Sequence, residues 1–468
     1  WVEPADGNPT ERAARPVRAP YAARMRVAIV GAGPTGLFSA MVLAGRGHRV
    51  TVVDRDRGPA ADGSWARTGV MQFHHPHGLR QQVISCLEAE LPAVKQALLA
   101  AGAVVTMLPA KGSRPEQLLG MQCRRSTFER VLRAAAVGTP GVTLLRGHAD
   151  DVLAADGRAA GLLVDGRELA ADLVLNASGR SGRIGDGLRG PAEGADCGLA
   201  YVSRHYELLP GAEAGPVNGP IGLMLRFPGY LAGVFQQDNR TVCLLITRLS
   251  TDRALADLRH EAAFDAAVRA IPGIDTWVSP QRSRPITGVL PGGHLRNSYR
   301  GQLRGGRVEL PGLIHVGDAV CTTNPTAGRG MATSLMQACE LLRLLGSGDD
   351  VETVTLAFDA WCHEQIRPWY ADHLAWDADE VRQWSGQDVD LSRPLTSGHI
   401  VAAGQADPSL MREIGAYQGM TALPRTLLAI EPRVHEIYAA GWRPPMPVGP
   451  SRDELAALIT PIAAAGAR

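Results

Sequence analysis

The sequence predicts an α/β fold in which a nucleotide-binding domain is interrupted by an antiparallel β-sheet and followed by a helical region. Three observations lead to this prediction. A strand, glycine turn, helix and strand follow one another from residue 26, consecutive strand-like runs fill residues 198–249, and residues 346–468 have mainly helical patterns. Apolar strands return after the antiparallel runs, which indicates that one nucleotide-binding sheet is assembled from separated segments.

The first pattern is typical of a Rossmann-like βαβ unit. The strand RVAIV at 26–30 leads into Gly31, Gly33 and Gly36, and the next strand, HRVTVVD, ends at Asp54. Glycines at this spacing permit a tight turn and let the helix N-terminus approach a pyrophosphate, while the carboxylate accepts hydrogen bonds from a ribose. A second string with the same glycine spacing lacks a preceding apolar strand and is expected to be a loop: Gly185, Gly187 and Gly190.

A downstream motif indicates which dinucleotide is bound. The string LIHVGDAVCTTNPTAGRGM places Asp318 at the end of a strand and before a Pro/Gly loop and a helix over 330–345. It resembles the GD motif of group A, para-hydroxybenzoate hydroxylase-like flavin monooxygenases, whose FAD domain is of the glutathione reductase type. The resemblance implies that Asp318 binds the FAD ribityl chain and that four residues lie near the isoalloxazine ring: Gly328, Arg329, Gly330 and Met331. The alternative is an aspartate that only caps an ordinary helix.

Two arginines complete the expected cofactor site. CRRSTFERVL resembles the element of these enzymes whose arginine approaches FAD from the start of a helix, which implies this role for Arg125. Arg67, in WARTGV, resembles an early arginine beside the cofactor, with a solvated surface position as the alternative. The matches occur in the family's order over residues 26–345, which favours FAD over NAD.

These matches predict the domain organisation. Residues 1–24 are rich in Pro and Arg without periodicity and are expected to be a disordered lead. The stretch 104–116 has a loop-like pattern. The expected domains are an FAD-binding domain (25–70, 115–190 and 285–345), a substrate domain (71–114 and 191–284) and a C-terminal helical region (346–468).

The substrate domain is expected to bind an apolar or aromatic molecule, because its strand-like runs carry few charges. We expect Met224 and Phe235 to line the pocket, together with Phe73 and His75 from a segment that crosses between the domains. Other apolar residues of these runs are Leu225, Phe227, Leu244 and Ile246, and half of the set must face the sheet's other side. The nearby histidines lack carboxylate or thiolate partners at ligand spacing, so no metal site is expected.

The composition is consistent with small-molecule chemistry. The chain has 468 residues, 45% of them hydrophobic, and this length is enough for two or three packed units. Its net charge of +1 lacks the basic excess that binds nucleic acid. No apolar run approaches the ~20 residues of a membrane helix, and no signal peptide is recognised, so a cytoplasmic protein without a membrane span is expected. Seven cysteines stand singly without CxxC or zinc spacing, and we interpret them as reduced thiols.

The resemblance implies an FAD-dependent monooxygenase that hydroxylates or epoxidises its substrate with one atom of O2, through a flavin C4a-hydroperoxide. The strings GVMQFHHPHGLR, NASGRSGR and GDAVCTTNP are similar to polyene epoxidases of polyether-antibiotic pathways and, more loosely, to styrene monooxygenase, which implies secondary metabolism. No catalytic side chain is identified. Ser178 stands where many hydroxylases have an aspartate, so NAD(P)H could reduce the flavin directly or through a separate flavin reductase.

Three other functions share this cofactor site. A reductase or dehydrogenase of the geranylgeranyl-reductase type would act on carbon–carbon bonds without consuming oxygen. A flavin-dependent halogenase would need an active-site lysine and a Trp-x-Trp-x-Ile-Pro motif. The motif is absent, and the two lysines, Lys95 and Lys111, lie in no matching context. The third is a non-enzymatic flavin-binding or sensory protein.

Overall fold

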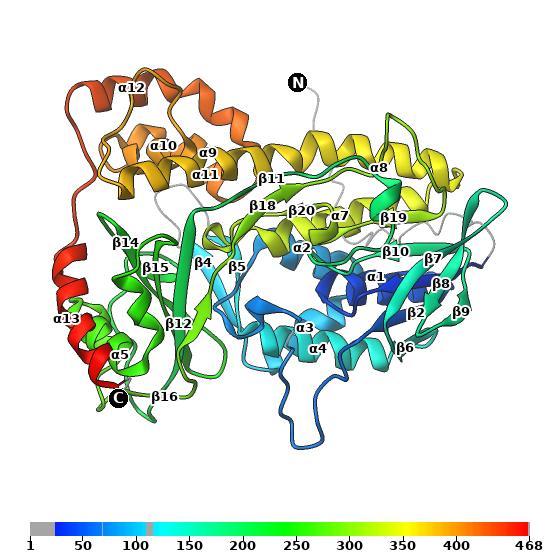
Figure 1. The fold of residues 1–468 in the computed structure, drawn as a ribbon, viewed down its shortest axis with the longest axis horizontal. Coiled ribbons are helices and arrows are strands. Elements are labelled where there is room, and N and C mark those ends of the chain that lie inside the picture. Colours follow the sequence, from blue (N-terminus) through cyan, green and yellow to red (C-terminus); the bar gives the residue numbers. More distant parts are fainter. Residues whose placement is uncertain (1–23, 68, 109–115, 467–468) are drawn as a thin grey trace, which may run out of the picture.

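The computed structural model describes residues 24–67, 69–108 and 116–466. The expected lead over 1–24 therefore lies almost wholly outside the described residues. Where the chain is described, the core is a five-stranded, all-parallel sheet of order β19-β10-β1-β2-β6 (Figure 1). In that order the strands are Leu313–His315, Leu173–Asn176, Arg26–Val30, Arg49–Asp54 and Val142–Arg146. The predicted βαβ unit and its later strands are thus confirmed as one Rossmann-like sheet.

Helices cover one face of this sheet, and a small antiparallel sheet covers the other. Val27, Ile29 and Val52 point into a core shared with the helices, whereas Ala28 and Val30 point into a separate cluster beneath β8. Because alternate side chains of a strand face opposite sides, a strand covered on both faces reads as a continuous apolar run. The covering elements are α1 (Pro34–Gly45), α4 (Arg125–Val137), α7 (Gly330–Leu345), β7 (Ala149–Ala155), β8 (Arg158–Val164) and β9 (Arg167–Ala170).

The segment after β2 differs from the prediction. Residues 104–108 form a strand, β4, in a three-stranded sheet of order β3-β5-β4, with β3 at Gly78–Arg80 and β5 at Gln117–Gln122. The helices α2 (Gln81–Glu90) and α3 (Pro92–Ala100) pack in the same core as α1 and α7. Their buried apolar positions therefore belong with the nucleotide-binding layers, and the assignment of all of 71–114 to the substrate domain is corrected.

The predicted antiparallel sheet is confirmed, with strand order β13-β14-β15-β12-β16 and β17 also paired to β12. One face packs on a helical layer and the other lines an internal cavity. The strands are β12 (Leu199–Leu208), β13 (Gly222–Phe227), β14 (Tyr230–Gln236), β15 (Thr241–Leu249), β16 (Ser283–Pro285) and β17 (Leu290–Gly292), and the helices of the outer layer are α5 (Glu261–Ala270), α6 (Ile274–Trp277) and α13 (Arg452–Gly466).

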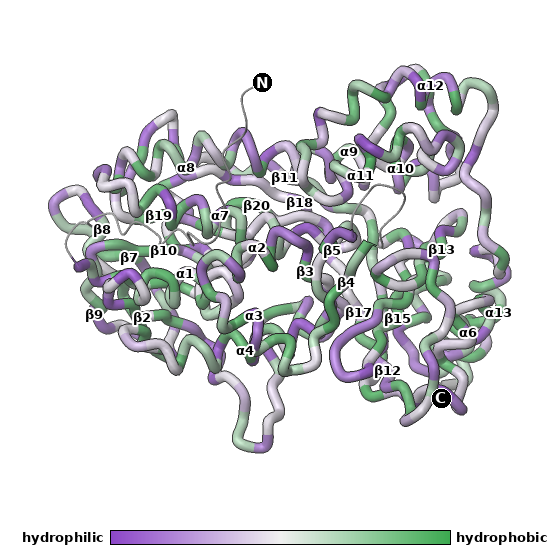
Figure 2. Tube along the Cα trace, turned by 180° about the vertical axis from the view of Figure 1, so that it is seen from behind, coloured by the Kyte–Doolittle hydropathy of each residue, from purple (hydrophilic) through white to green (hydrophobic). Residues whose placement is uncertain are grey.

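The C-terminal region divides into two parts. Its first five helices lie together above the sheets, whereas α13 returns to the outer face of the antiparallel sheet beside α5 (Figure 1). The five are α8 (Val351–Gln365), α9 (Arg367–Trp384), α10 (Ser397–Ala403), α11 (Met411–Gln418) and α12 (Glu431–Ala439). The outer helices α8 and α12 mix hydrophilic and hydrophobic positions along the trace, as expected for helices with one exposed face (Figure 2).

The remaining elements connect these layers. A short sheet of order β11-β18-β20 contains Glu193–Asp196, Arg296–Tyr299 and Cys321–Thr322. The short 3₁₀ helices are η1 (Met71–His74), η2 (Asp186–Leu188), η3 (Leu255–Arg259), η4 (Gly317–Ala319), η5 (Pro325–Ala327), η6 (Pro408–Leu410) and η7 (Pro424–Ala429). Among the helices of the described ranges, none combines the length and apolarity needed to cross a membrane.

The packing of α13 predicts a local stability difference. Leu455 is fully buried in the core of the antiparallel sheet layer, whereas Leu458 on the same helix is 38% exposed. Leu455→Ala should lower the free energy of unfolding by about 2–5 kcal/mol, because it leaves a cavity, and Leu458→Ala should change it by less than about 1 kcal/mol. Urea unfolding followed by circular dichroism checks this, and equal losses for both variants would contradict the packing.

Candidate cofactor and substrate site

One cavity of about 1220 Å³ connects the carboxyl ends of the parallel strands with the inner face of the antiparallel sheet. Sites for single drug-sized ligands usually occupy ~300–1,000 Å³, so this cavity has room for a dinucleotide and a second molecule. Crevices at the carboxyl ends of strands are where open α/β sheets bind ligands.

The glycine turn forms a cradle at one end of the cavity. Gly31 has a φ of 104°, and a Cβ on Gly36 would lie 1.9 Å from the Gly31 carbonyl oxygen, so both positions are closed to larger residues by the protein itself. Gly33, the N-cap of α1, is different. It lines the cavity, and a Cβ there would meet nothing within 4 Å. The open space at Gly33 therefore lies at a helix N-terminus, where anionic groups bind well.

A network of charges surrounds Asp54 at the same end. The backbone N–H of Ala32 donates to the Asp54 carboxylate (2.6 Å), and Arg67 donates to the same oxygen (2.9 Å). The fully buried Glu129 carboxylate then accepts from Arg67 (2.5 Å) and from Arg125 (2.6 Å). Asp54, Arg67 and Arg125 all line the cavity, so these predicted cofactor residues form one linked group at the end next to the glycine turn.

Arg67 does not occupy a solvated surface position. Its side chain is 6% exposed, and the alternative of a surface role is therefore wrong. Burial alone would lower the pKa of Arg67, but Glu129 and Asp54 outweigh this effect and raise it. The guanidinium is thus a fixed positive charge at the edge of the cavity.

Asp318 lies farther along the cavity, in η4 directly after β19. Ser334 on α7 donates a hydrogen bond to its carboxylate (3.2 Å). Burial raises the pKa of Asp318, while the positive charge of Arg125 opposes the rise. The aspartate is therefore a desolvated acceptor on the cavity wall and not merely the cap of an exposed helix.

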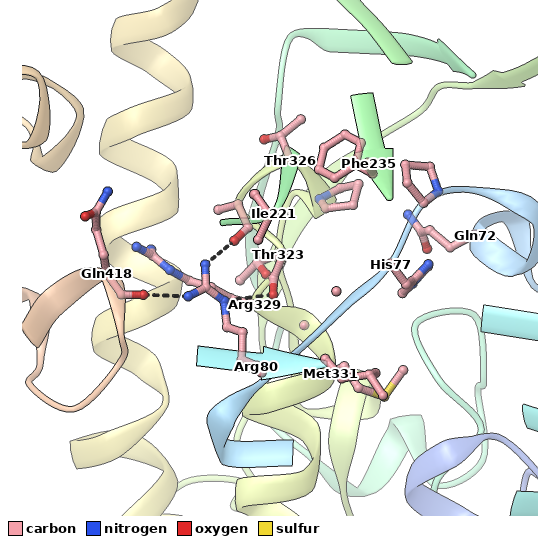
Figure 3. A pocket seen from close by; sticks show the side chains of 18 of the residues that line it. Gln72, His77, Arg80, Ile221, Phe235, Thr323, Thr326, Arg329, Met331 and Gln418 are labelled. Carbon is pink, nitrogen blue, oxygen red and sulfur yellow. Dashed lines mark hydrogen bonds between the residues drawn. The ribbon is translucent and has the colours of Figure 1, made fainter. Parts of the chain in front are cut away.

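The loop after Asp318 lines the cavity at Gly328, Gly330 and Met331. Figure 3 shows Met331 there. The contact of these residues with a flavin ring stays a prediction. Arg329 differs, because its guanidinium is already occupied. It forms an ion pair with Asp372 on α9 (2.7 Å) and lies over the rings of Trp369 and Tyr417. Its charge is therefore directed into the C-terminal helices, although the residue lies on the cavity wall.

His75 and His77 line the cavity, and His205 is buried beside them. His75 Nδ1 is 2.8 Å from the Ser203 hydroxyl, and His205 Nε2 donates to the His74 carbonyl (2.7 Å). His77 Nδ1 donates to the His75 carbonyl (3.1 Å), which leaves Nε2 as its acceptor nitrogen. Burial lowers the pKa of His75 to about 4, of His77 to about 3 and of His205 to about 4, so all three rings are neutral at pH 7.

The antiparallel sheet forms the second end. Met224 and Phe235 line the cavity as predicted, with Tyr201, Leu231 and Leu245 beside them. Leu225, Phe227, Leu244 and Ile246 face the helical layer, which accounts for the other half of the apolar set. Phe73 is a correction: it is buried against the edge of the Trp65 ring, with centroids 5.0 Å apart, and is not among the residues that line the cavity.

Sequence reasoning missed contributors from distant segments. Arg80 donates to the carbonyls of Ala327 (2.7 Å) and Gly328 (3.0 Å) and to that of Gln418 (2.5 Å), so it joins the cofactor loop to α11 (Figure 3). Trp376 and Trp384 of α9 also line the cavity, and Trp384 packs against the apolar residues of the sheet. Among these residues, only Glu129 could have been identified from the sequence. It stands four residues after Arg125, which is the spacing of helical ion pairs. No local pattern marks the others.

The residues present fit FAD. The cradle at Gly33 and the guanidinium groups suit a pyrophosphate, Asp54 suits a ribose, and Asp318 suits the hydroxyls of a ribityl chain. The apolar wall farther on can pack against a flat ring. Fold and site together define an FAD-dependent oxidoreductase.

Comparisons with known proteins agree with this class. Residues 26–116 match the family model described as FAD dependent oxidoreductase. The chain is 27% identical over 363 residues to Protein Rv3254 of Mycobacterium tuberculosis, an alignment that covers 68% of this chain and 72% of the relative.

Solved structures show the same fold. A triple mutant of the flavin-dependent brominase Bmp2 superposes with a TM-score of 0.60 at 16% identity, over 89% of this chain and all of that one. PqsL, a probable FAD-dependent monooxygenase from Pseudomonas aeruginosa, superposes with a TM-score of 0.55 at 16% identity, over 78% and 99% of the two chains.

The open space at Gly33 predicts a variant that separates cofactor binding from folding. A methyl group at Gly33 meets no protein atom but occupies the mouth of the cradle, so Gly33→Ala should keep the apoprotein's melting temperature and weaken FAD binding at least about tenfold, or ~1.4 kcal/mol. Gly45→Ala is the control, since Gly45 lies at the exposed end of α1 and also has open space. Fluorescence titration with FAD measures both, and equal affinities would exclude the cradle.

The histidines predict a loss of stability on acidification. Their pKa is lower in the folded than in the unfolded chain, so between pH 6.5 and about 4 the unfolded chain binds protons that the folded one does not. The free energy of unfolding should therefore fall as the pH falls through this range. His205→Gln keeps a donor for the His74 carbonyl and removes one titrating group, so urea unfolding at pH 7 and pH 5 should differ less for the variant than for the wild type. An unchanged pH dependence would contradict this.

Proposed function

We propose that the protein is an FAD-dependent monooxygenase that inserts one oxygen atom of O2 into an apolar or aromatic small molecule. The observation that carries the proposal is the continuity of the cavity, which places a chamber for a second molecule directly beyond the cofactor residues. When bound and reduced, FAD supplies the electrons that activate O2. The likeness to PqsL supports this reaction class, and hydroxylation and epoxidation both fit an apolar chamber.

The residues of the chain have two roles in this function. Leu231, Phe235 and Leu245 hold the substrate by apolar contact and exclude water from the reacting atoms. The neutral His77 presents Nε2 as an acceptor, so a hydroxyl or N–H of the substrate can be oriented there without a charged partner. Oxygen transfer to an electron-rich carbon does not require an acidic or basic side chain. This agrees with the neutral rings of His75 and His77.

A halogenase is the second candidate, because the brominase Bmp2 has the same fold. Lys95 lies on α3 in an ion pair with Glu88, away from the cavity walls, and Lys111 lies outside the described residues. A halogenase would form product only with bromide or chloride present, which distinguishes it from a monooxygenase. A reductase of the geranylgeranyl type is distinguished by turnover without oxygen.

The source of electrons stays a prediction. Ser178 lines the cavity, and its hydroxyl donates to Asn176 (2.5 Å), so it offers no carboxylate to a nicotinamide cofactor at this position. NADPH and NADH should therefore reduce the bound flavin slowly by themselves and faster when a flavin reductase is added. Anaerobic stopped-flow absorbance compares the rates.

Rapid mixing tests the monooxygenase reaction. The FAD-loaded protein is photoreduced without oxygen and mixed with O2, and the flavin absorbance should pass through a species distinct from both the reduced and the oxidised cofactor. Indole is the apolar aromatic probe, and it should change the lifetime of that species. Leu245→Trp, which fills the chamber, should remove the effect of indole and keep FAD bound. Single-step reoxidation with release of hydrogen peroxide under every condition would contradict the proposal.

A further inference from the structure

The segment between β20 and α7 forms the cavity wall where the predicted flavin ring lies, yet it contains little regular structure. Residues 323–330 include only the single turn η5, and Gly328 ends that turn with a φ of 62°. Backbone with so few internal hydrogen bonds needs support from outside to hold one conformation. The structure supplies this support from α9.

Asp377 of α9 is the centre of the first support. Its carboxylate accepts a hydrogen bond from the side-chain amide of Asn297 on β18 (2.6 Å) and another from that of Asn324 (2.8 Å). Both asparagines are fully buried, and Asp377 is 5% exposed. The three side chains therefore form a closed polar group inside the protein.

Asn324 transmits this support to the loop. Its backbone N–H donates to the Asn297 side chain (2.6 Å), and its own side-chain oxygen accepts from the N–H of Thr326 (3.1 Å), which caps η5. Every polar atom of the Asn324 side chain is thus used, with its oxygen toward the loop and its amide toward Asp377. Rotation of Asn324 would break both contacts.

Two further contacts hold the other end of the segment. Asp372, also on α9, binds Arg329 (2.7 Å) and accepts from the Tyr417 hydroxyl (2.6 Å). Arg80 holds the intervening carbonyls of Ala327 and Gly328. The segment is therefore fixed at its start, middle and end, twice by carboxylates of one helix.

We propose that Asp377 is a positioning residue for the cofactor, which through Asn324 fixes residues 324–330 in the conformation that FAD binding requires. The inference concerns cofactor binding and is independent of the oxygen chemistry proposed above. A bound group tolerates displacements of only ~0.5 Å in the residues around it, and those residues depend on their own supporting hydrogen bonds.

The charge on Asp377 matters because two amide donors face its carboxylate, one from Asn297 and one from Asn324. Burial raises the pKa of Asp377 to about 6, and the hydrogen bonds from Asn297, Asn324 and the Cys197 thiol oppose the rise. A carboxylate accepts from both amides at once, whereas an asparagine has one acceptor oxygen and its own N–H groups. Substitution by asparagine therefore preserves the shape and removes one of the two acceptors.

The first test is Asp377→Asn. We expect FAD binding to weaken by about tenfold or more, as when the supporting partner of a ligating group is removed. The visible circular dichroism of the flavin at saturating FAD should also change, because the loop is displaced. A purely structural role predicts a lower melting temperature of the apoprotein with the wild-type FAD affinity, and that result would overturn the proposal.

An exchanged pair provides the decisive test. In the double variant Asp377→Asn with Asn324→Asp, the amide at 377 donates to the carboxylate at 324, its oxygen accepts from Asn297, and the carboxylate at 324 still caps Thr326. The hydrogen bond between positions 324 and 377 is thus restored with its direction reversed, and the bonds to Asn297 and Thr326 keep their original direction. FAD affinity and the flavin spectrum should return to within about threefold of the wild type, although each single variant is impaired. A folded double variant with no recovery would overturn the proposal.

Asp379→Asn is the matched control. Asp379 lies two residues farther along α9 and binds Gln383 and His399, not the loop, so FAD affinity should stay unchanged. If Asp377→Asn does not fold, Asn324→Ala replaces it, because it keeps the contact between Asp377 and Asn297. Wild-type FAD affinity in Asn324→Ala would likewise overturn the proposal.

Discussion

The buried Glu129 carboxylate holds together the end of the cavity next to the glycine turn. It lies between Arg67 and Arg125. Without it Arg125 would lose its carboxylate partner, and Arg67 would keep only Asp54 and the more distant Asp56. Removing one partner from a buried ion pair usually costs about 3–5 kcal/mol, so the positions of both arginines depend on this one side chain. Through Arg67 the same network reaches Asp54 and the glycine turn, and it thereby joins two segments that are distant in sequence.

A second constraint is that the two faces of the antiparallel sheet have different roles. Tyr201, Leu231 and Leu245 face the cavity, while their neighbours Val202, Ala232 and Leu244 pack on the helical layer. Strand geometry requires this alternation, and the consequence is that stability and specificity are assigned to alternate residues of the same strands. Substitutions on the cavity face can alter the chamber without removing the packing that supports it.

Sequence reasoning predicted the parts of the structure that local physics determines. The apolar period of β1 and α1, the glycines between them and Asp54 at the end of β2 are all short-range features, and so is the helix α7 after Asp318. It missed β4, whose Val104 and Val105 are more than 40% exposed and give no alternating pattern. It also could not place Arg80 against Gly328, or turn Arg329 toward Asp372, because these contacts depend on how α9 and α11 cross the loop.

The return of α13 to the antiparallel sheet has a consequence for how the chain folds. Arg452 pairs with Asp252 across 200 positions, and Leu455 and Ile459 close a core beneath a sheet whose last strand ends at Gly292. Contacts between such distant segments form slowly, because a long loop must close before they give any stabilisation. During synthesis the outer apolar face of the sheet is therefore complete long before α13 emerges from the ribosome to cover it, which makes this face the region of the nascent chain most in need of protection from aggregation.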